Sequence, residues 1–276
     1  MDRFYIVTND GKDTDGTVTG SILRILKEAG KTCLFSEKDQ DKNIIPATVP
    51  QDADCALVIG GDGSLIQVAR SLKSEIPILG INMGTLGYLT EAEPAHIEEA
   101  IQQILKGSYS IEDRMMLEGS FYAGQKNIAL NDIVVSRKGD LRVIHFDLYV
   151  NGSFLNSYEA DGMIVSTPTG STAYNLSAGG PVVEPTASLI VLTPICSHAL
   201  NTSSIVLSAE DEIIIKIGVG RNGRREEVFV FFDGEDMVEL RTGDRIVIKK
   251  SSHVTKLIKL NKVSFLEILH RKMKGN

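Results

Sequence analysis

Hydrophobic residues in the first 107 positions alternate between short apolar runs and segments with helical spacing. Apolar runs predict strands at residues 4–8, 32–35, 56–59 and 76–81. Three other segments carry apolar residues at helical spacing: Val18, Ile22, Ile25, Leu26 and Ala29; Leu65, Ile66, Val68, Ala69 and Leu72; and Ile97, Ala100, Ile101, Ile104 and Leu105. Short strands without polar alternation are typical of a parallel sheet covered on both faces. We therefore predict a Rossmann-like α/β domain at residues 1–107.

From residue 109 onward the pattern changes to that of β-strands. Apolar runs of strand length recur at residues 128–135, 143–150, 163–165, 189–193, 212–217, 228–232 and 245–249. Asn151 and Gly152 predict a tight hairpin, because both residue types tolerate positive φ angles. The spacing predicts an all-β, β-sandwich-like domain at residues 108–261. Residues 262–276 predict a terminal helix, which we expect to pack back on the first domain.

Composition disfavours several classes of protein. The net charge of −7 argues against a nucleic-acid partner, which needs a clustered positive surface. The apolar runs are too short to cross a bilayer, and the first residues lack the pattern of a secretory signal. We therefore expect a cytoplasmic protein with no membrane partner. Cys33, Cys55 and Cys196 are odd in number and lie in apolar runs, which predicts buried thiols.

The first candidate site is residues 60–64, Gly-Gly-Asp-Gly-Ser, between a predicted strand and a predicted helix. Glycines let a backbone approach a phosphate closely, and the start of a helix offers N–H groups. A carboxylate repels a phosphate group, so a loop that only binds phosphate gains nothing from one. Asp62 therefore indicates a base that accepts a hydroxyl proton, or a ligand that assists Mg²⁺, and both roles belong to phosphoryl transfer. These five residues alone leave an alternative open, a turn aspartate that caps the next helix.

Two further loops point to the same chemistry. Residues 80–89 follow another predicted strand and contain three glycines. Carboxyl ends of strands in an open α/β sheet form the crevice where ligands bind. Residues 167–174, Thr-Pro-Thr-Gly-Ser-Thr-Ala-Tyr, offer hydrogen bonds without adding negative charge near phosphates. Residues 218–223 match the spacing of the dinucleotide fingerprint but lead straight into a strand, so we predict a hairpin loop there.

Together these segments resemble the NAD kinase family over nearly the entire chain. Residues 60–64 are similar to its GGDG motif, which diacylglycerol-type lipid kinases and 6-phosphofructokinases share. Residues 82–89 and 161–174 are similar to its GIN-x-G-x-LGF-L and DG-x-x-x-STPTGSTAY segments. Asn131 and Asp132 resemble its Asn-Glu pair, and residues 232–235 its FDGQ turn. The resemblance implies a kinase that phosphorylates the adenosine 2′-hydroxyl of NAD with ATP to make NADP, and a homodimer or homotetramer.

The same resemblance implies roles for individual residues. Asp62 is expected to be the proton acceptor, with Gly63 as its close-approach neighbour. Asn131 and Asp132 are expected at the nucleoside, and Arg142 at a phosphate or ribose. The remaining residues expected to bind nucleotide are Tyr88, Asp161, Thr169, Thr172, Ala173, Tyr174, Asn175, Leu176, Ser177 and Glu235.

The chain departs from the family pattern at a few of these positions. Ser64 replaces the usual Thr, and Tyr88 a common Phe. Asp132 replaces Glu, which keeps the charge on a shorter side chain and predicts an altered ligand contact. Glu235 replaces Gln. A negative charge near a pyrophosphate is unfavourable unless the side chain points away or meets Arg142.

The expected mechanism is in-line transfer of the γ-phosphoryl group, with Mg²⁺ neutralising the phosphates. No oxygen-ligand cluster in the sequence resembles a metal cage, so we expect no metal site of the protein itself. Mg²⁺, or another divalent cation, is expected to arrive with ATP.

Two alternatives stay open on the sequence. One is a GGDG-type kinase of a lipid or a sugar phosphate, and the uncharged loop at residues 167–174 speaks against a lipid. The other is a non-catalytic NAD- or NADP-binding sensor, against which the retention of Asp62 counts. The choice between ATP and polyphosphate, the use of NADH, regulation by NADP(H) and the oligomeric state are also open.

Overall fold

The chain, described by a computed structural model over residues 1–39, 44–139, 142–198, 203–260 and 263–274, forms two compact units. The first unit is Met1–Arg114 with His253–Asn276, and the second is Met115–Ser252. Two long strands, β5 (Ser110–Phe121) and β16 (Arg245–Lys259), continue from one unit into the other. Among the residues described, none of the helices is long and apolar enough to cross a membrane.

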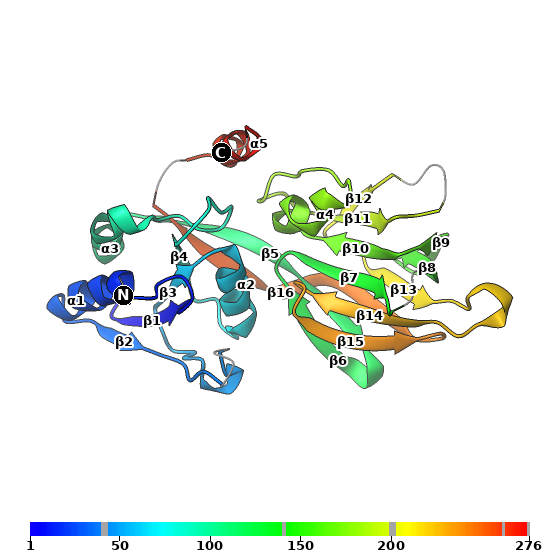
Figure 1. The fold of residues 1–276 in the computed structure, drawn as a ribbon, viewed down its shortest axis with the longest axis horizontal. Helices are drawn as coiled ribbons and strands as arrows, with labels where there is room; N and C mark the ends of the chain where they lie inside the picture. The colour runs from blue at the N-terminus through cyan, green and yellow to red at the C-terminus, as the bar shows by residue number, and fades with distance from the viewer. Residues whose placement is uncertain (40–43, 140–141, 199–202, 261–262, 275–276) are drawn as a thin grey trace. The chain divides into compact units, whose positions relative to one another are not determined.

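The first unit contains a parallel sheet with helices on both faces (Figure 1). Its strands lie in the order β2 (Thr32–Leu34), β1 (Arg3–Thr8), β3 (Cys55–Gly60), β4 (Ile78–Asn82) and the last part of β16. The helices are α1 (Thr17–Glu28), α2 (Asp62–Ser71) and α3 (Ile97–Leu105), with short 3₁₀ turns at Pro46–Thr48 and Pro94–His96.

Successive residues of β4 show how the two faces are covered. Leu79 and Ile81 belong to the core beneath α1 and α3, which pack against each other. Gly80 faces the other side, where a methyl group on it would lie 2.8 Å from Leu65 of α2. Side chains of a strand alternate between faces, so both faces of this strand are buried. The predicted α/β architecture is confirmed.

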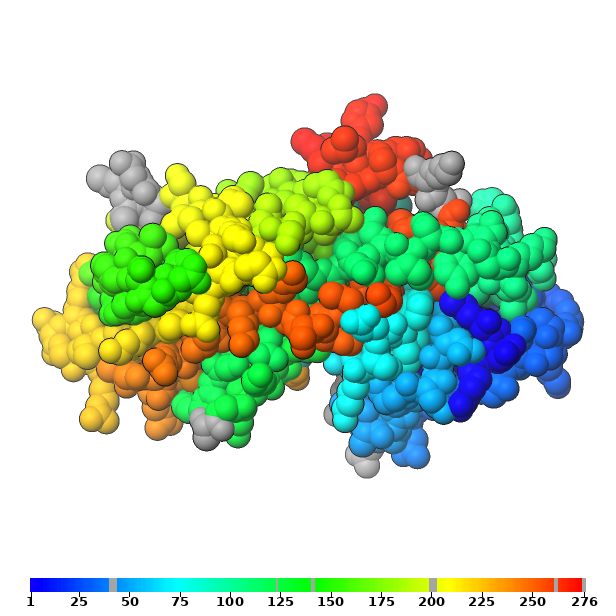
Figure 2. Space-filling view, turned by 180° about the vertical axis from the view of Figure 1, so that it is seen from behind, coloured from blue at the N-terminus to red at the C-terminus, as the bar shows by residue number. Residues whose placement is uncertain are grey.

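The terminal helix α5 (Phe265–Met273) belongs to the first unit and contacts Tyr88. Ser264 caps the helix, because its side chain accepts the N–H of Glu267 at 3.2 Å. The Phe265 ring lies 6.1 Å from the Tyr88 ring, and Lys272 Nζ lies 4.3 Å from the centre of that ring. Figure 2 shows α5, in red, as a raised lobe. The helix therefore covers a residue that the sequence predicts to bind nucleotide.

The second unit is built from antiparallel strands in two sheets. One sheet has the order β12 (Ile205–Ser208), β11 (Leu189–Ile195), β10 (Gly162–Ser166), β7 (Asp132–Arg137), β14 (Glu227–Phe232) and β15 (Asp236–Arg241). In the other, the first part of β16 is followed by β13 (Ile213–Ile217), β8 (Ile144–Val150) and β9 (Ser153–Ala160), and β5 pairs with both β16 and β6 (Gln125–Ala129). The connections contain 3₁₀ turns at Tyr122–Gly124, Thr169–Thr172 and Arg221–Gly223 and the short helix α4 (Tyr174–Ser177).

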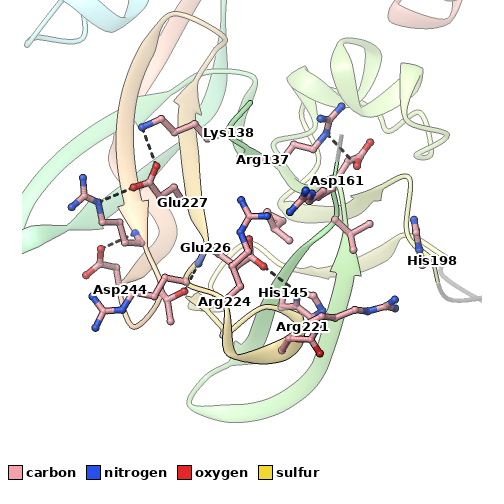
Figure 3. A pocket seen from close by; sticks show the side chains of 17 residues that line it. Arg137, Lys138, His145, Asp161, His198, Arg221, Arg224, Glu226, Glu227 and Asp244 are labelled. Carbon is pink, nitrogen blue, oxygen red and sulfur yellow. Dashed lines mark hydrogen bonds and ion pairs between the residues drawn. The ribbon is translucent and has the colours of Figure 1, made fainter. Parts of the chain in front are cut away.

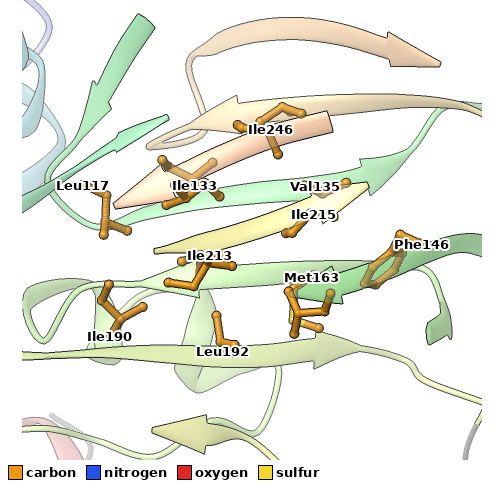
Figure 4. Close-up of a cluster of buried hydrophobic side chains, with 14 of the residues drawn as sticks. Leu117, Ile133, Val135, Phe146, Met163, Ile190, Leu192, Ile213, Ile215 and Ile246 are labelled. Atoms are coloured by element: carbon orange, nitrogen blue, oxygen red, sulfur yellow. The ribbon is translucent and has the colours of Figure 1, made fainter. Parts of the chain in front are cut away.

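Alternate residues of the two sheets fill one hydrophobic core (Figure 4). Ile133 and Val135 of β7 and Ile213 and Ile215 of β13 are each fully buried in it. Their spacing of two residues is that of strands with one face toward a core. The predicted β-rich, sandwich-like architecture is confirmed.

Several local predictions need correction. The single strand predicted at residues 128–135 is wrong, because β6 ends at Ala129 and β7 begins at Asp132. Residues 218–223 form no α-helix, as predicted, and an antiparallel bridge between Val219 and Arg225 closes a local hairpin loop there. The strands on either side, β13 and β14, belong to different sheets. Only Cys55 of the three cysteines is fully buried, and Cys196 is exposed. The hairpin at Asn151 and Gly152 is confirmed, with positive φ angles of 50° and 76°.

Candidate functional site

Three loops leave the same edge of the parallel sheet in the first unit. The register pairs Thr8 with Ile59 and Gly60 with Asn82, so the carboxyl ends of β1, β3 and β4 are neighbours. We call the segments that follow these ends, residues 9–12, 60–63 and 83–89, the edge loops. The second and third are the glycine-rich segments predicted from the sequence, and the fold brings them together.

Asp62 joins two of the edge loops. Its Oδ2 accepts the backbone N–H of Tyr88 at 2.7 Å, and its Oδ1 accepts that of Leu89 at 3.2 Å. A methyl group on Gly87 would overlap with Oδ1, so this approach requires glycine. The N-cap residue of α2 is Gly61, and none of the described side chains caps that helix. Asp62 therefore holds the third edge loop in place. The alternative role, a turn aspartate that caps the next helix, does not apply, because Asp62 does not cap α2.

Four of the predicted residues in the second unit line one cavity. Asn131, Asp132, Ala173 and Tyr174 surround a space of about 450 Å³, together with residues of β7 and of the β14–β15 turn. We call this space the β7 cavity. Asp132 is 5% exposed, and burial, with a smaller effect of the nearby Asp233 charge, raises the pKa of its carboxyl group to about 7. The cavity thus contains a carboxyl group that changes charge near neutral pH.

Asp233, which we did not predict as a site residue, shapes this cavity. Its carboxylate accepts the backbone N–H groups of Leu130, Asn131 and Asp132 at 2.8, 2.7 and 3.1 Å. The residue lies in the β14–β15 turn with φ of 53°, and Gly234 follows with φ of 74°. An Asp-Gly pair between two strands is a turn signal. That signal could have placed the turn, but not its contact with residues a hundred positions earlier.

Residues 167–174, which we call the hydroxyl-rich loop, pack against Leu130 and Asn131. Thr167 donates its N–H to the carbonyl of Asn131 at 2.8 Å, and its hydroxyl donates to that of Leu130 at 2.6 Å. Gly170 approaches Asn131 so closely that a methyl group on it would overlap with the Asn131 carbonyl. The fold therefore fixes this loop beside the β7 cavity.

The predicted residues of this loop and of α4, which follows it, differ in their exposure. Thr169 and Asn175 are buried, and Asn175 bonds Ser171, Pro181 and Thr193. Tyr174 is 46% exposed, and the neighbouring predicted residues are partly or fully exposed, namely Thr172, Ala173, Leu176 and Ser177. Side chains that bond within the loop support its shape, whereas the exposed ones are accessible to a ligand.

Arg142 and Asp161 line a different, larger cavity of about 1010 Å³ (Figure 3). This cavity begins where β7 ends, because Arg137 and Lys138 also line it. Arg137 Nε lies 3.3 Å from Asp161 Oδ1, so the predicted aspartate is held by an arginine that we did not predict. The two cavities follow one another along β7, since Asp132, Val134 and Ser136 line the first.

The remaining predicted residues lie as follows. Gly63 is exposed at the start of α2, and Tyr88 is half-buried beneath α5, both in the first unit. Glu235 is exposed, follows Gly234 of the β7 cavity, and is not among the described residues that line either cavity. Apart from Glu235, the structure therefore gathers the predicted residues into three groups: the edge loops, the β7 cavity with its hydroxyl-rich loop, and the cavity of Arg142 and Asp161.

Comparisons with known proteins match both parts of the chain to the same family. Residues 4–109 match the family described as the ATP-NAD kinase N-terminal domain, and residues 130–260 match the ATP-NAD kinase C-terminal domain. The NAD kinase of Lachnospira eligens is 45% identical over 99% of this chain and its own full length. That of Agathobacter rectalis is 46% identical over 100% of this chain and 99% of its own.

Solved structures show the same likeness. An NAD kinase from Archaeoglobus fulgidus in complex with ATP superposes with a TM-score of 0.81 and is 28% identical, covering 99% of this chain and 100% of its own. A yeast NADH kinase complexed with NADH gives a TM-score of 0.84 over 100% of this chain and 88% of its own. At 22% identity, the yeast protein shows only that the fold is shared.

Proposed function

This chain belongs to the NAD kinase family, and we propose that it transfers the γ-phosphoryl group of ATP to the adenosine 2′-hydroxyl of NAD, with Mg²⁺, to produce NADP. It is therefore a phosphotransferase. The observation that carries the proposal is the position of Asp62, an oriented carboxylate on glycine-rich loops at the carboxyl edge of a parallel sheet.

Asp62 is the proposed proton acceptor for the 2′-hydroxyl group. Each carboxylate oxygen carries two lone-pair sites, and each accepts one backbone N–H here. A second site on each oxygen remains for the hydroxyl proton, and the two N–H groups fix the direction in which the carboxylate points. A base positioned in this way contributes about 10²–10⁴-fold to such a reaction.

The β7 cavity is the proposed site for the adenosine part of NAD. Its volume of about 450 Å³ suits a nucleoside, and Asn131 and Asp132 supply hydrogen-bonding groups at its wall. Tyr174 supplies an exposed aromatic face. The cavity of Arg142 and Asp161 follows along β7, so we propose that the rest of the dinucleotide extends toward it.

Whether the protein can hold Mg²⁺ depends on which side chains are available as metal ligands. Within the described ranges, no group of three His, Cys, Asp or Glu side chains could hold a metal ion by itself. Mg²⁺ commonly uses one or two carboxylates together with substrate phosphates. The residues therefore fit an ion brought by ATP, for which Asp62 is the candidate carboxylate. When bound, Mg²⁺ neutralises phosphate charge during transfer.

The proposal also extends to the setting of the enzyme. By resemblance to the family, we propose a cytoplasmic homodimer or homotetramer that binds small nucleotides and no nucleic acid. Light scattering coupled to size-exclusion chromatography measures the oligomer directly.

The test of the proposed reaction is an assay of NADP from purified protein, NAD, ATP and Mg²⁺. NADP should form with Mg²⁺ and should not form with excess EDTA. Replacing ATP by inorganic polyphosphate, or NAD by NADH, defines the donor and the acceptor. If NAD binds but no NADP forms, the sensor alternative replaces the kinase.

A further inference from the structure

Lys12 lies among the edge loops, although its sequence context does not single it out. A methyl group on Gly61 would lie 2.7 Å from Lys12 Nζ, and one on Gly84 would lie 3.6 Å from it. The ammonium group therefore lies against the backbone of both glycine-rich edge loops, next to the residue that precedes Asp62.

The loop that carries Lys12 is anchored on both sides. Asn9 donates its backbone N–H to Ile59 at 2.8 Å and its side-chain amide to the Ser64 hydroxyl at 3.2 Å. Asp13 is 5% exposed, and its carboxylate accepts the N–H groups of Val18 and Thr19 at 3.2 and 2.9 Å. The fold thus fixes the backbone of Lys12 in relation to α1 and α2.

The carboxylates of the neighbouring loops are engaged with other groups. Asp10 pairs with Lys38 at 2.8 Å, Asp13 bonds the start of α1, and Asp62 bonds the third edge loop. Within the described part of the chain, the Lys12 ammonium forms no hydrogen bond or ion pair. A fixed cation over glycine backbone, in a chain of net charge −7, is suited to a compact anion such as a phosphate group.

We propose that Lys12 binds the terminal phosphates of the phosphoryl donor, a role that rests on the proposed kinase reaction. In that reaction the acceptor oxygen bonds to the γ-phosphorus while the bond from that phosphorus to the bridging oxygen breaks. The electron pair leaves with the diphosphate product, and the hydroxyl proton passes to Asp62. Negative charge shifts onto the bridging oxygen, where a fixed ammonium group stabilises it. Lys12 itself transfers no proton.

The test compares Lys12→Met with Lys12→Arg and with the control Lys73→Met, which changes an exposed lysine elsewhere in the first unit. Lys12→Met should lower kcat/KM for ATP about 10- to 100-fold, the effect of losing one hydrogen bond to a charged group. The KM for NAD should change less than about twofold, because Lys12 acts on the donor. Lys12→Arg should restore most of the activity, and Lys73→Met should match the unaltered chain.

Binding measurements separate this proposal from the kinase reaction itself. Calorimetry should show weaker binding of ATP and of inorganic tripolyphosphate to Lys12→Met, and unchanged binding of adenosine. That result would support the role of Lys12 even if no NADP formed. The proposal is overturned if Lys12→Met binds ATP and tripolyphosphate as the unaltered chain does, or if adenosine binding falls equally.

Discussion

Asp62 combines a structural contact with a proposed chemical role at the scale of a single residue. Its carboxylate accepts two backbone N–H groups from the third edge loop, at Tyr88 and Leu89. An amide of the same size has one acceptor oxygen and would present N–H donors to one of those groups. The isosteric variant therefore tests both roles, provided that stability and turnover are measured separately.

Asp62→Asn should lower kcat by at least about 10²-fold, because an amide cannot accept the hydroxyl proton. Nucleotide binding should survive, since removing the negative charge relieves repulsion against phosphates. One lost backbone contact should lower stability by about 1 kcal/mol. We would measure NADP formation in single turnover and nucleotide affinity by calorimetry on the same preparation. Near-normal turnover would remove Asp62 from the role of base.

Tyr174→Ala should raise the KM for NAD about tenfold or more, because the aromatic face contributes about 1 kcal/mol beyond area burial. The ring is 46% exposed, so thermal stability should change little. Phe154→Ala, at another exposed aromatic ring of the second unit, is the matched control and should leave the KM unchanged. A large loss of stability with an unaltered KM would show that Tyr174 serves only in packing.

The residues that the sequence predicts are those whose chemistry is carried by a local motif. Asp62 lies among glycines after a strand, and Tyr174 ends a hydroxyl-rich loop. Lys12 and Arg137 have ordinary local contexts. Their neighbours, Gly61 and Asp161, come from distant segments, so only the folded chain identifies them.

At the scale of elements, the break between β6 and β7 decides the shape of the β7 cavity. The apolar run at residues 128–135 predicts one strand, yet the backbone turns away at Leu130 and Asn131. Their N–H groups, with that of Asp132, bond the Asp233 carboxylate instead of a neighbouring strand. A long-range contact thus overrides the local preference for a continuous strand.

Asp233→Ala should destabilise the protein by about 3 kcal/mol, because three backbone N–H groups lose their acceptor. The matched control is Asp236→Ala, which removes an exposed carboxylate that bonds the Asn127 side chain and should cost less than about 1 kcal/mol. Urea denaturation gives both values. Equal stability of the two variants would mean that solvent replaces the carboxylate at the break.

Helices and strands whose apolar residues recur at regular spacing were predictable from the sequence, and the other elements were not. The three helices and the parallel strands of the first unit follow from apolar spacing. Strands β5 and β15 carry several charged residues, and β12 has only four residues, so the apolar pattern predicts none of them. Their strand structure comes from pairing with neighbours, which is a property of the folded sheet.

At the scale of the whole molecule, the proposed site residues are distributed over both units. Asp62 and Lys12 belong to the first unit, whereas Asn131, Asp132 and Tyr174 belong to the second. The family resemblance predicts all of these residues except Lys12, because it spans the chain. It does not give the protonation of Asp132, which depends on burial that only the structure shows.

The stability of the whole molecule should depend on pH through Asp132. Its carboxyl group titrates near 3.8 in an unfolded chain and at about 7 in the folded one. Between these values the folded chain binds one more proton than the unfolded chain. The free energy of unfolding therefore falls as pH rises through this range, by about 1.4 kcal/mol for each unit of pKa difference. Above pH 7 the penalty is complete, because the buried carboxylate is charged beside Asp233.

Asp132→Asn removes this titration and should flatten the pH dependence. From pH 5 to pH 7, the unaltered chain should lose roughly 2 kcal/mol of unfolding free energy that the variant keeps, apart from changes that both share through other groups. Urea denaturation of both proteins at pH 5, 6, 7 and 8 gives the difference directly, so shared titrations cancel. A difference that stays constant with pH would show that Asp132 is charged throughout this range in the folded chain. In that case burial and Asp233 do not raise its pKa, and a group beside it compensates the charge.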